Sequence, residues 1–535
     1  MRFLGKLSSA KHLFWVAGIF FSLSAPAQYL DQIGLTTLRA VTTNLNGAGV
    51  TVAQAEASAP AFEVNPNAVG QPTNLFTWIA GTNPYVSPPD TSSTFTNSLG
   101  VESGHADNVG NDFYGIPNGV ATNVAHVNNY DANTFVNYYI ANDYAITERI
   151  VNQSFTFSER PVPDQQAIDS IYDDYAESYG TLFVSAPNNY GIYNPPASYN
   201  TTNVVPPGTA YNCICVGAVD SGGTHNSLGP TIDNGRCKPD LTAPAGATSY
   251  STPQVAGAVA VLMQAALRGD GGDDTNAASD LRTIKVLLLN GAVKSADWTN
   301  NAPSPLDYRY GAGVLNLFNS YEQLAGGKQN FCASNSVASG TAHPPVAGTN
   351  FVAVTSGWDF ESLASDATND VVKHYFFNVS NGMATVTLVW NRQFGQTNIN
   401  NLDLFLYDCA NSNLVACSTS LVDNVEHIFV PKLAAGRYDL QVWKAGGSFV
   451  SASESYALAW AFVSPALGLA PSGTNAVLSW PVYPAGFRAE AATNLAAPVW
   501  ITNGLSSAVI TNSRNSLILN ATNVLQFFRL RSPNF

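Results

Sequence analysis

The chain has 535 residues, of which 23 are Lys or Arg and 37 are Asp or Glu, so its formal net charge is −14 at pH 7. This surplus of negative charge repels phosphate groups, which argues against a nucleic-acid partner. A chain of this length predicts about two to four compact units rather than one domain.

The first 27 residues have the pattern of a secretory signal peptide. Basic residues precede an apolar run at residues 13–23 that is short for a membrane span, and Ala25-Pro26-Ala27 then forms a small-x-small cleavage site. We therefore expect cleavage before Gln28 and a mature chain that is secreted or held at the cell surface. The alternative is an uncleaved anchor. No later stretch is apolar and long enough to cross a membrane, so the mature chain is expected to have no membrane span.

From residue 28 to residue 327, short apolar strands alternate with helices. Strands are predicted at 49–53, 150–152, 182–184 and 214–217. The i, i+3, i+4, i+7 spacing of apolar residues from Ile168 to Tyr175 predicts an amphipathic helix. The nearly all-apolar stretch Pro253–Leu267 predicts a buried helix. Together they predict an α/β fold with a doubly wound parallel sheet.

Beyond residue 327 the pattern changes to strands separated by Gly and Asn turns. These strands are predicted at 385–390, 401–407, 427–430, 438–443 and 456–462. No helical period interrupts them, so residues 328–464 are expected to form an antiparallel β-sandwich. A further change near Ser464 begins a strand-rich segment, 465–535, which we expect to be a second all-β module.

The six Cys residues fit an oxidising compartment. Cys409 and Cys417 bracket a short loop and are predicted to form a disulfide. The other four could be paired or free; they are Cys213, Cys215, Cys237 and Cys332. No Cys lies at a metal-ligand spacing from a His, so the sequence predicts no zinc site.

Three carboxylates in the predicted sandwich are candidates for a structural calcium site, namely Asp403, Asp408 and Asp423. Solvated turn carboxylates are the alternative, and the sequence predicts no other cofactor.

A polar turn at Ala247-Thr248-Ser249 runs into the buried helix. A Ser in the first turn of a helix has an exposed hydroxyl, and the free N–H groups beside it carry partial positive charge. Those groups could stabilise the oxyanion that forms when Ser249 attacks an acyl carbon. The alternative is a helix-capping Ser, which the turn alone does not exclude.

A Ser hydroxyl needs a base to act as a nucleophile. Between residues 28 and 327 the His residues are His105, His126 and His225. His105 has small neighbours on both sides, Gly104 and Ala106, which let another part of the backbone approach. It is therefore the preferred candidate for the base, with a surface or capping role as the alternative.

Four segments resemble the motifs of the subtilisin-like serine peptidases, the subtilases. Residues 247–257 (ATSYSTPQVAG) are similar to the family's serine motif, and residues 103–110 (SGHADNVG) are similar to its histidine motif. Residues 234–244 (NGRCKPDLTAP) and 310–316 (YGAGVLN) resemble two further family segments. All four occur in the family's order, and the resemblance covers residues 28–327.

The resemblance implies a role for each matching residue. Ser249 would attack the peptide carbonyl, and His105 would take its proton and return it to the leaving amine. Asn188, which follows the strand at 182–184, would help to hold the oxyanion. Asn152 and Ser154 resemble the family's substrate-lining strand, which would bind the peptide by strand addition.

The family's third catalytic residue is an Asp at the end of the first strand, and the aligned residue here is Glu56. Glu retains the carboxylate but is one methylene longer, and a misplacement of about 1 Å can lower a rate on the order of a hundredfold. Asp90 is a second candidate, in a sequence that resembles the family's Asp turn, but no strand is predicted before it. We therefore predict Glu56 as the triad acid.

Together these residues predict a secreted, monomeric serine endopeptidase that acts on protein or peptide substrates. One alternative is a catalytically impaired pseudo-peptidase that binds peptides without cleaving them. The other is an extracellular binding or adhesion protein in which the β modules dominate.

Overall fold

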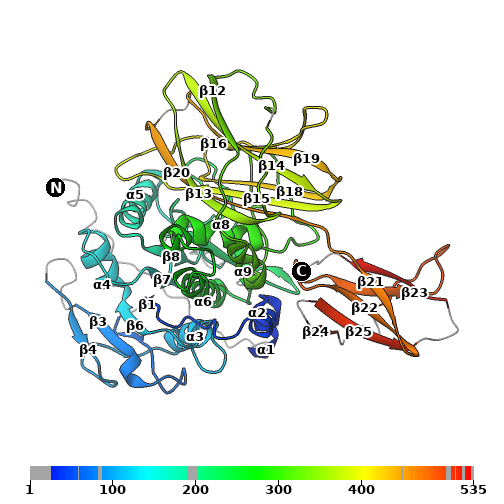
Figure 1. The fold of residues 1–535 in the computed structure, drawn as a ribbon. Coiled ribbons are helices and arrows are strands. Elements are labelled where there is room, and N and C mark those ends of the chain that lie inside the picture. Colours follow the sequence, from blue (N-terminus) through cyan, green and yellow to red (C-terminus); the bar gives the residue numbers. More distant parts are fainter. Residues whose placement is uncertain are drawn as a thin grey trace.

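The computed structural model of the chain describes residues 26–57, 59–81, 87–157, 159–189, 203–346, 348–447, 450–501, 508–511, 514–520 and 525–531. The predicted signal peptide lies outside these residues except for its last two positions. Figure 1 shows an α/β domain, a β-sandwich packed above it, and a small β module near the carboxyl end of the chain.

The centre of the α/β domain is a nine-stranded sheet. Its strands follow the order β10-β9-β8-β7-β1-β6-β3-β4, and β11 pairs with β9 outside this path. The strands from β9 to β3 are parallel, whereas β4 and β10 are antiparallel edges. Their bounds are β1 Thr51–Glu56, β3 Phe76–Ala80, β4 Asp90–Ser92, β6 His126–Asp131, β7 Ile150–Gln153, β8 Leu182–Ser185, β9 Ile214–Asp220, β10 Gly223–Thr224 and β11 Leu241–Pro244. The predicted parallel α/β sheet is confirmed.

Helices cover both faces of this sheet. Successive residues of a strand point to opposite faces; in β7, Ile150 packs in the core that contains α3 and α6, whereas Val151 packs in the core that contains α5. The bounds are α3 Gly104–Phe113, α5 Val162–Tyr179 and α6 Thr248–Leu267. Both predicted helices lie within α5 and α6, and α6 is buried on nearly all sides from Val255 onward, where its residues are almost all apolar.

The remaining elements of this part are short. They are α1 Pro26–Gln32, α2 Leu35–Val41, β2 Ala61–Glu63, the 3₁₀ turn Thr73–Leu75, β5 Val101–Glu102, α4 Ala132–Thr134, the π-helical segment Phe135–Ile140, α7 Thr275–Ala278, α8 Leu281–Gly291 and α9 Leu317–Ala325. In the part of the chain that the structure describes, no helix is long and apolar enough to span a membrane.

The β-sandwich consists of two facing antiparallel sheets, with orders β12-β14-β19-β16-β17 and β13-β20-β15-β18. Its core includes the fully buried Trp390 and Trp460. The five predicted strands correspond to β15 Gly382–Trp390, β16 Leu402–Asp408, β18 Val425–Leu433, β19 Gly436–Lys444 and β20 Ser453–Val463. Four others were not predicted: β12 Ala333–Ala338, β13 Ser356–Ala364, β14 Asn369–Val379 and β17 Asn413–Ser418.

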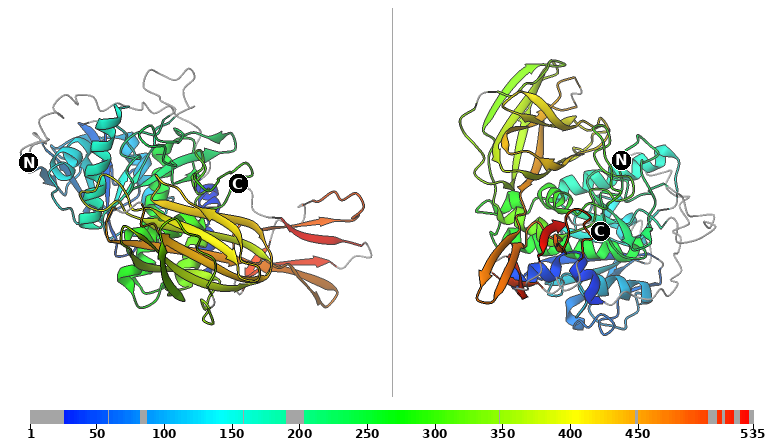
Figure 2. Two further views of the ribbon diagram at one scale, coloured as in Figure 1. Left: turned by 90° about the horizontal axis from the view of Figure 1, so that it is seen from above. Right: turned by 90° about the vertical axis from the view of Figure 1, so that its right-hand side faces the viewer.

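The final module is also all-β. Its strands form the sheets β21-β22-β25-β24 and β23-β26 around the buried Leu478 and Trp480. The bounds are β21 Gly468–Ser472, β22 Asn475–Pro481, β23 Arg488–Ala492, β24 Val509–Thr511, β25 Arg514–Asn520 and β26 Phe527–Arg531. Figure 2 shows this module projecting from the rest of the molecule.

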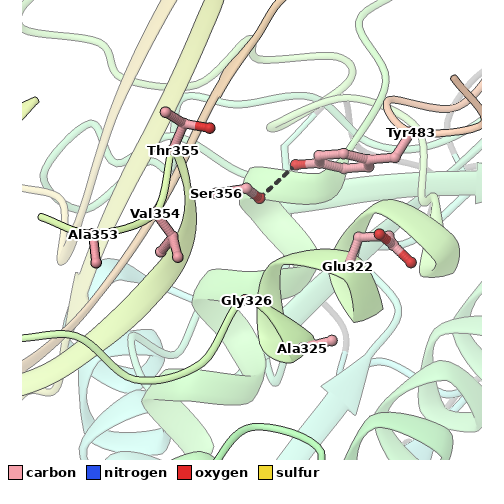
Figure 3. Close-up of a pocket in the computed structure, with 8 residues that line it drawn as sticks. All are labelled: Glu322, Ala325, Gly326, Ala353, Val354, Thr355, Ser356 and Tyr483. Atoms are coloured by element: carbon pink, nitrogen blue, oxygen red, sulfur yellow. Dashed lines mark hydrogen bonds between the residues drawn. The ribbon is translucent and has the colours of Figure 1, made fainter. Parts of the chain in front are cut away.

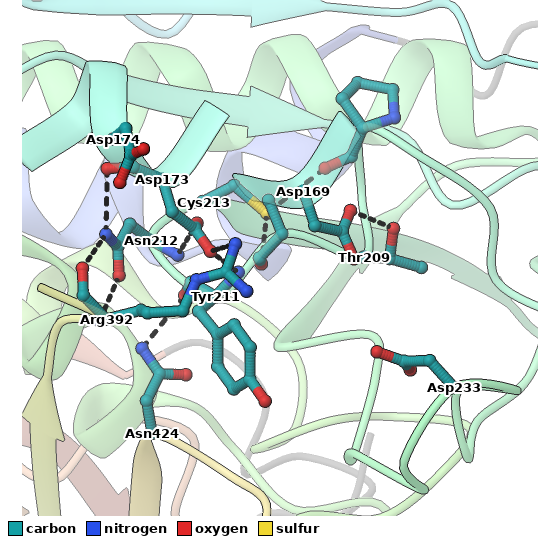
Figure 4. A network of polar contacts seen from close by, with 12 residues as sticks. Asp169, Asp173, Asp174, Thr209, Tyr211, Asn212, Cys213, Asp233, Arg392 and Asn424 are labelled. Carbon is teal, nitrogen blue, oxygen red and sulfur yellow. Dashed lines mark hydrogen bonds and ion pairs between the residues drawn. The ribbon is translucent and has the colours of Figure 1, made fainter. Parts of the chain in front are cut away.

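The sandwich joins the α/β domain through buried polar side chains (Figure 4). Arg392, in the connection between β15 and β16, lies 2.7 Å from the Asp173 carboxylate of α5 as an ion pair, although this N–H group is not aligned for a hydrogen bond. The Arg392 N–H donates to Asn212 Oδ1 at 2.8 Å, and Asn212 Nδ2 donates back to the Arg392 carbonyl at 2.9 Å. Asn424 Nδ2 donates to the Tyr211 carbonyl at 3.0 Å.

Two guanidinium groups lie against the ring of Tyr211 where the sandwich meets the α/β domain. The Arg236 guanidinium lies 4.0 Å and the Arg392 guanidinium 5.0 Å from the ring centre. Arg236 in turn pairs with Asp169 and Asp233, and all these side chains are buried. The segment before β9 is therefore held by charges from both the α/β domain and the sandwich.

The predicted disulfide between Cys409 and Cys417 is wrong, since both cysteines are free. Cys417 lies in β17 opposite Phe405, whereas Cys409 follows the end of β16 at Asp408. Four residues of strand separate Phe405 from Cys409, a rise of about 13 Å. That separation far exceeds the Cα distance of a disulfide, about 4.4–6.8 Å.

Candidate active site

The candidate residues meet at the carboxyl edge of the parallel sheet. Glu56 is the last residue of β1, Ser154 follows β7, and Asn188 and Asn189 follow β8. The carboxyl ends of parallel strands share one edge, which is where ligands bind in open α/β sheets.

Glu56 contacts His105 directly. His105 Nδ1 lies 2.8 Å from Glu56 Oε2. His105 is the second residue of α3, whose N-terminus is capped by Ser103 Oγ accepting from the Ala106 N–H. An ionised carboxylate only accepts hydrogen bonds, so Nδ1 carries the proton and Nε2 is left as the basic nitrogen. The longer side chain of Glu56 therefore reaches the imidazole.

The environment of His105 changes its basicity. Burial lowers the pKa of the imidazole, but the nearby Glu56 charge and its hydrogen bond raise it, and the net pKa lies above the ordinary value. The Glu56 side chain is 2% exposed whereas that of His105 is 28% exposed. Glu56 is thus shielded from solvent, whereas the His105 ring remains accessible to it.

Ser249 lies in the first turn of α6. Ala247, at the N-cap position, has no side chain that could cap the helix. Asn189 supplies the cap instead, because its Oδ1 accepts from the Thr248 N–H at 2.7 Å and from Thr248 Oγ1 at 2.8 Å. The Ser249 N–H precedes the first turn of intrahelical bonds and is available to an oxyanion.

The carbonyl of Ser249 has an unusual partner. Pro253, four residues later, has no N–H and cannot complete the helical hydrogen bond to this carbonyl. Ser154 Oγ fills the gap by donating to the Ser249 carbonyl at 2.9 Å, and Asn152 Nδ2 donates to Ser154 Oγ at 3.1 Å. The chain from β7 therefore fixes the backbone of Ser249.

The structure brings the His105 and Ser249 segments together. The rings of His105 and Tyr250 lie with their centres 6.2 Å apart. Among the described residues, no hydrogen bond joins the Ser249 hydroxyl to His105. Catalytic hydrogen bonds are often long before substrate binds and tighten only in the complex.

Asn188 and Asn189 have different surroundings. Asn188 has a φ of 97°, a left-handed conformation that Asn tolerates, and its Oδ1 accepts from the Asn189 N–H at 2.8 Å. Asn189 is the residue whose side chain contacts the N-terminus of α6. The sequence predicts Asn188 as the oxyanion residue and does not single out Asn189; the only signal for the second residue is the Asn-Asn pair itself.

Asn152 and Ser154 are buried, and their side chains face Ser249 rather than open solvent. β7 is hydrogen-bonded to β1 on one edge and to β8 on the other through Gln153. A peptide could add as a strand only to the backbone beyond Gln153. There the Phe157 N–H already donates to the Pro206 carbonyl at 2.8 Å.

A cavity of about 470 Å³ lies elsewhere, between α9, the segment 353–356 and Tyr483 of the final module (Figure 3). The Tyr483 and Ser356 hydroxyls lie 2.9 Å apart at its rim. Burial raises the pKa of Glu322 in its lining. None of the candidate catalytic residues lines this cavity.

The carboxylates considered for calcium are bound within the protein. Asp408 Oδ1 accepts from the Ala410 N–H, and Asp423 accepts from the Cys237 N–H and Ser420 Oγ, each near 2.7–2.8 Å. Burial raises the pKa of Asp403 to about 7. Within the described residues, no three His, Cys, Asp or Glu side chains form a group that could hold a metal ion.

Comparison with known proteins agrees with the motifs. Residues 128–313 match the sequence model of the subtilase family, Peptidase S8. This region contains Ser249 and the Asn188-Asn189 pair, whereas Glu56 and His105 precede it. No curated protein is significantly similar in sequence.

The chain is also similar to solved structures of two proteases. A serine protease of Aeromonas sobria is 14% identical, with 91% of this chain and 89% of that chain covered and a TM-score of 0.37. Tripeptidyl peptidase 2 is 13% identical, with 74% of this chain and 43% of that chain covered and a TM-score of 0.30.

Proposed function

Because the chain contains a domain of the subtilase family, we propose that it is a serine endopeptidase with Ser249, His105 and Glu56 as its catalytic triad. The observation that carries this proposal is the 2.8 Å contact between His105 and Glu56. Both residues lie outside the region matched by the family model, so this contact is independent of that match. The third member of the triad is a Glu that reaches the imidazole as the family's Asp would.

In the proposed reaction, His105 Nε2 takes the proton from Ser249 Oγ as that oxygen bonds to the scissile carbonyl carbon. The tetrahedral intermediate then expels the amine, which receives the proton from His105. Water, deprotonated by the same imidazole, next attacks the acyl carbon; the bond from that carbon to Ser249 Oγ breaks, and Oγ takes the proton back from His105. Glu56 holds the Nδ1 tautomer and stabilises the imidazolium that forms in each half of the reaction.

The oxyanion would lie at the N-terminus of α6. The Ser249 N–H and the helix dipole are one source of stabilisation. The second is an Asn amide, and the contacts support Asn189 in place of the Asn188 predicted from sequence. Thr248 donates to Oδ1 of Asn189, which leaves Nδ2 of Asn189 to donate to an oxyanion. Within the described residues, this Nδ2 makes no hydrogen bond.

Secretion and a monomeric state belong to this proposal. The pattern of residues 1–27 supports export, as does the scarcity of charged side chains, which make up 11% of the chain. Sequencing the amino terminus of the exported protein tests this, with Gln28 as the expected first residue. A first residue upstream of Ala25 would contradict the cleavage site.

A pseudo-peptidase is the second candidate, favoured by the absence of a Ser249–His105 hydrogen bond in the described residues. A serine-directed fluorophosphonate distinguishes the two functions. The active enzyme is expected to be labelled at Ser249, and Ser249→Ala to lose labelling and casein hydrolysis, on the order of a millionfold. A folded wild-type protein that resists labelling, under conditions that label a known subtilase, would overturn the enzyme.

A further inference from the structure

The second carboxylate oxygen of Glu56 has its own partner. Glu56 Oε2 faces His105, whereas Glu56 Oε1 accepts from Gln54 Nε2 at 2.9 Å. Gln54 and Glu56 are two residues apart in β1, so their side chains lie on the same face of the sheet. Both side chains are buried, with Gln54 fully inaccessible. Each carboxylate oxygen of Glu56 therefore has its own hydrogen-bond partner.

The Gln54 amide is itself fixed on every side. Its Nε2 also donates to the Ala106 carbonyl at 2.9 Å, and its Oε1 accepts from the Tyr114 hydroxyl at 2.6 Å. Turning the amide over would place its oxygen against two acceptors, Glu56 Oε1 and the Ala106 carbonyl. The contacts thus assign one orientation of Gln54, in which it can only donate to Glu56.

These contacts tie both ends of one helix to one strand. α3 carries His105 and Ala106 in its first turn and ends at Tyr114, its C-cap residue. The first turn reaches β1 through Glu56 and Gln54, and the last residue reaches it through the Tyr114 hydroxyl. The same helix therefore carries the base, His105, and Tyr114, which holds the Gln54 amide against the acid.

We propose that Gln54 and Tyr114 are positioning residues that hold the longer Glu56 side chain against His105. Glu has one more rotatable bond than Asp, so a carboxylate gripped only by the imidazole could rotate away. Donation from Gln54 to one oxygen fixes the plane of the carboxylate and leaves the other oxygen on Nδ1. This inference rests on the proposed triad and adds the residues that allow a Glu to replace the family's Asp.

The test measures the rate of fluorophosphonate labelling against pH for the full-length protein. In Gln54→Met the amide is replaced by an apolar chain of similar length, so Glu56 is free to leave His105. Burial then dominates the basicity of the imidazole, and the pH at half-maximal labelling is expected to fall. The maximal rate is expected to drop about 10- to 100-fold. Tyr114→Phe is expected to act in the same direction but less.

A matched control exists on the neighbouring strand. Gln153 in β7 lies opposite Ala55, and its Nε2 donates to the buried Tyr172 hydroxyl at 2.9 Å without touching Glu56. Gln153→Met removes the same kind of buried Gln–Tyr contact from the same sheet. It is expected to lower thermal stability while leaving the pH at half-maximal labelling at the wild-type value. Circular dichroism of each variant gives the folded fraction by which its rate is corrected.

The outcomes separate this inference from the proposed function. If wild-type protein is labelled at Ser249 but Gln54→Met and Tyr114→Phe keep the wild-type pH midpoint, the positioning role is wrong and the triad stands. An upward shift would show Glu56 still seated on His105 and would equally overturn it. If wild-type protein is not labelled, the proposed function itself fails.

Discussion

Glu56 and Asp173 are both buried carboxylates of the α/β domain, and each meets a side chain that is or can become a cation. The separations are nearly the same, 2.8 Å from Glu56 to His105 and 2.7 Å from Asp173 to Arg392. The partners differ in exposure, because the His105 side chain is 28% exposed and that of Arg392 only 5%. One pair opens to solvent and the other is sealed between two parts of the molecule.

The difference shows how one kind of contact serves two purposes. An imidazole gains and loses a proton near neutral pH, and its free Nε2 can exchange that proton with a substrate. A guanidinium is always charged and offers planar contacts, here to a carboxylate and to the ring of Tyr211. We therefore expect changes at the open pair to alter rates, and changes at the sealed pair to alter stability.

Among changes at the two pairs, the largest effect is expected from Glu56→Gln. The amide can donate to His105 as well as accept, so it no longer fixes the tautomer that leaves Nε2 basic. Loss of the triad acid's charge in this way lowers kcat about ten-thousandfold in a well-studied Ser-His-Asp enzyme. Single-turnover hydrolysis of a peptide ester measures it. An unchanged rate would assign the acid to another carboxylate.

The pH profile sharpens the same point. The base must be neutral to act, so activity rises as pH passes through the His105 pKa. In the wild type that pKa is raised by Glu56, so the midpoint is expected above 6.5. In Glu56→Gln the charge that raises the His105 pKa is gone, while burial still lowers that pKa. The midpoint is therefore expected below 6.5. A midpoint that does not move between the two proteins would break the proposed coupling.

The oxyanion residue is expected to give the next largest effect. Asn189→Ala removes the amide beside Thr248, and loss of one oxyanion donor lowers kcat about 100- to 1000-fold. Asn188→Gly, which tolerates the left-handed backbone of this position, is the comparison variant and is expected to have a much smaller effect on kcat. Steady-state hydrolysis by the two variants compares them directly. The reverse ranking would return the role to Asn188.

At the sealed pair, Arg392→Met is expected to destabilise the protein by about 3 kcal/mol, because it leaves Asp173 buried without its cation. Chemical denaturation of the full-length chain measures the free energy of unfolding. Arg268→Met is the matched control at an exposed ion pair with Asp270, where the loss is expected to be within about 1 kcal/mol. Equal losses at the two sites would mean that burial of the Asp173 pair has no energetic consequence.

The smallest effect is expected from Cys409→Ser with Cys417→Ser. Since these cysteines are free and far apart, the double variant should change the free energy of unfolding by about 0.5 kcal/mol or less. A native disulfide would instead cost about 2–5 kcal/mol when removed. Thiol titration of the unfolded wild type without reductant gives an independent reading, since a bridge would hide two thiols.

The candidate catalytic residues were predicted from local motifs. The turn before α6 pointed to Ser249, the small neighbours to His105, and alignment of the first strand to Glu56. The contact between Glu56 and His105 could not be predicted, because it depends on where α3 packs against β1. Gln54 and Tyr114 were missed for the same reason, since a buried Gln and a Tyr at a helix end carry no chemical signature of their own.

The strands predicted in the α/β sheet are apolar, and β6 shows why a polar strand escapes such a pattern. β6 reads His-Val-Asn-Asn-Tyr-Asp, yet it is a central strand and Asn129 is fully buried. Asn129 Oδ1 accepts from the Val64 N–H, and its Nδ2 contacts the Gln54 and Phe62 carbonyls. Such tertiary hydrogen bonds offset the cost of burying an amide, but they are invisible to a pattern of apolar residues.

The contact between the sandwich and the α/β domain also affects the order in which contacts can form during synthesis. Arg392 follows Asn212 by 180 residues, and Asn424 follows Tyr211 by 213 residues. At a synthesis rate of about 5–20 residues per second, the earlier residues wait roughly 10 to 40 seconds for their partners. Until then Asp173 lacks the Arg392 guanidinium. The contacts that join the α/β domain to the sandwich can therefore form only after the sandwich has been made.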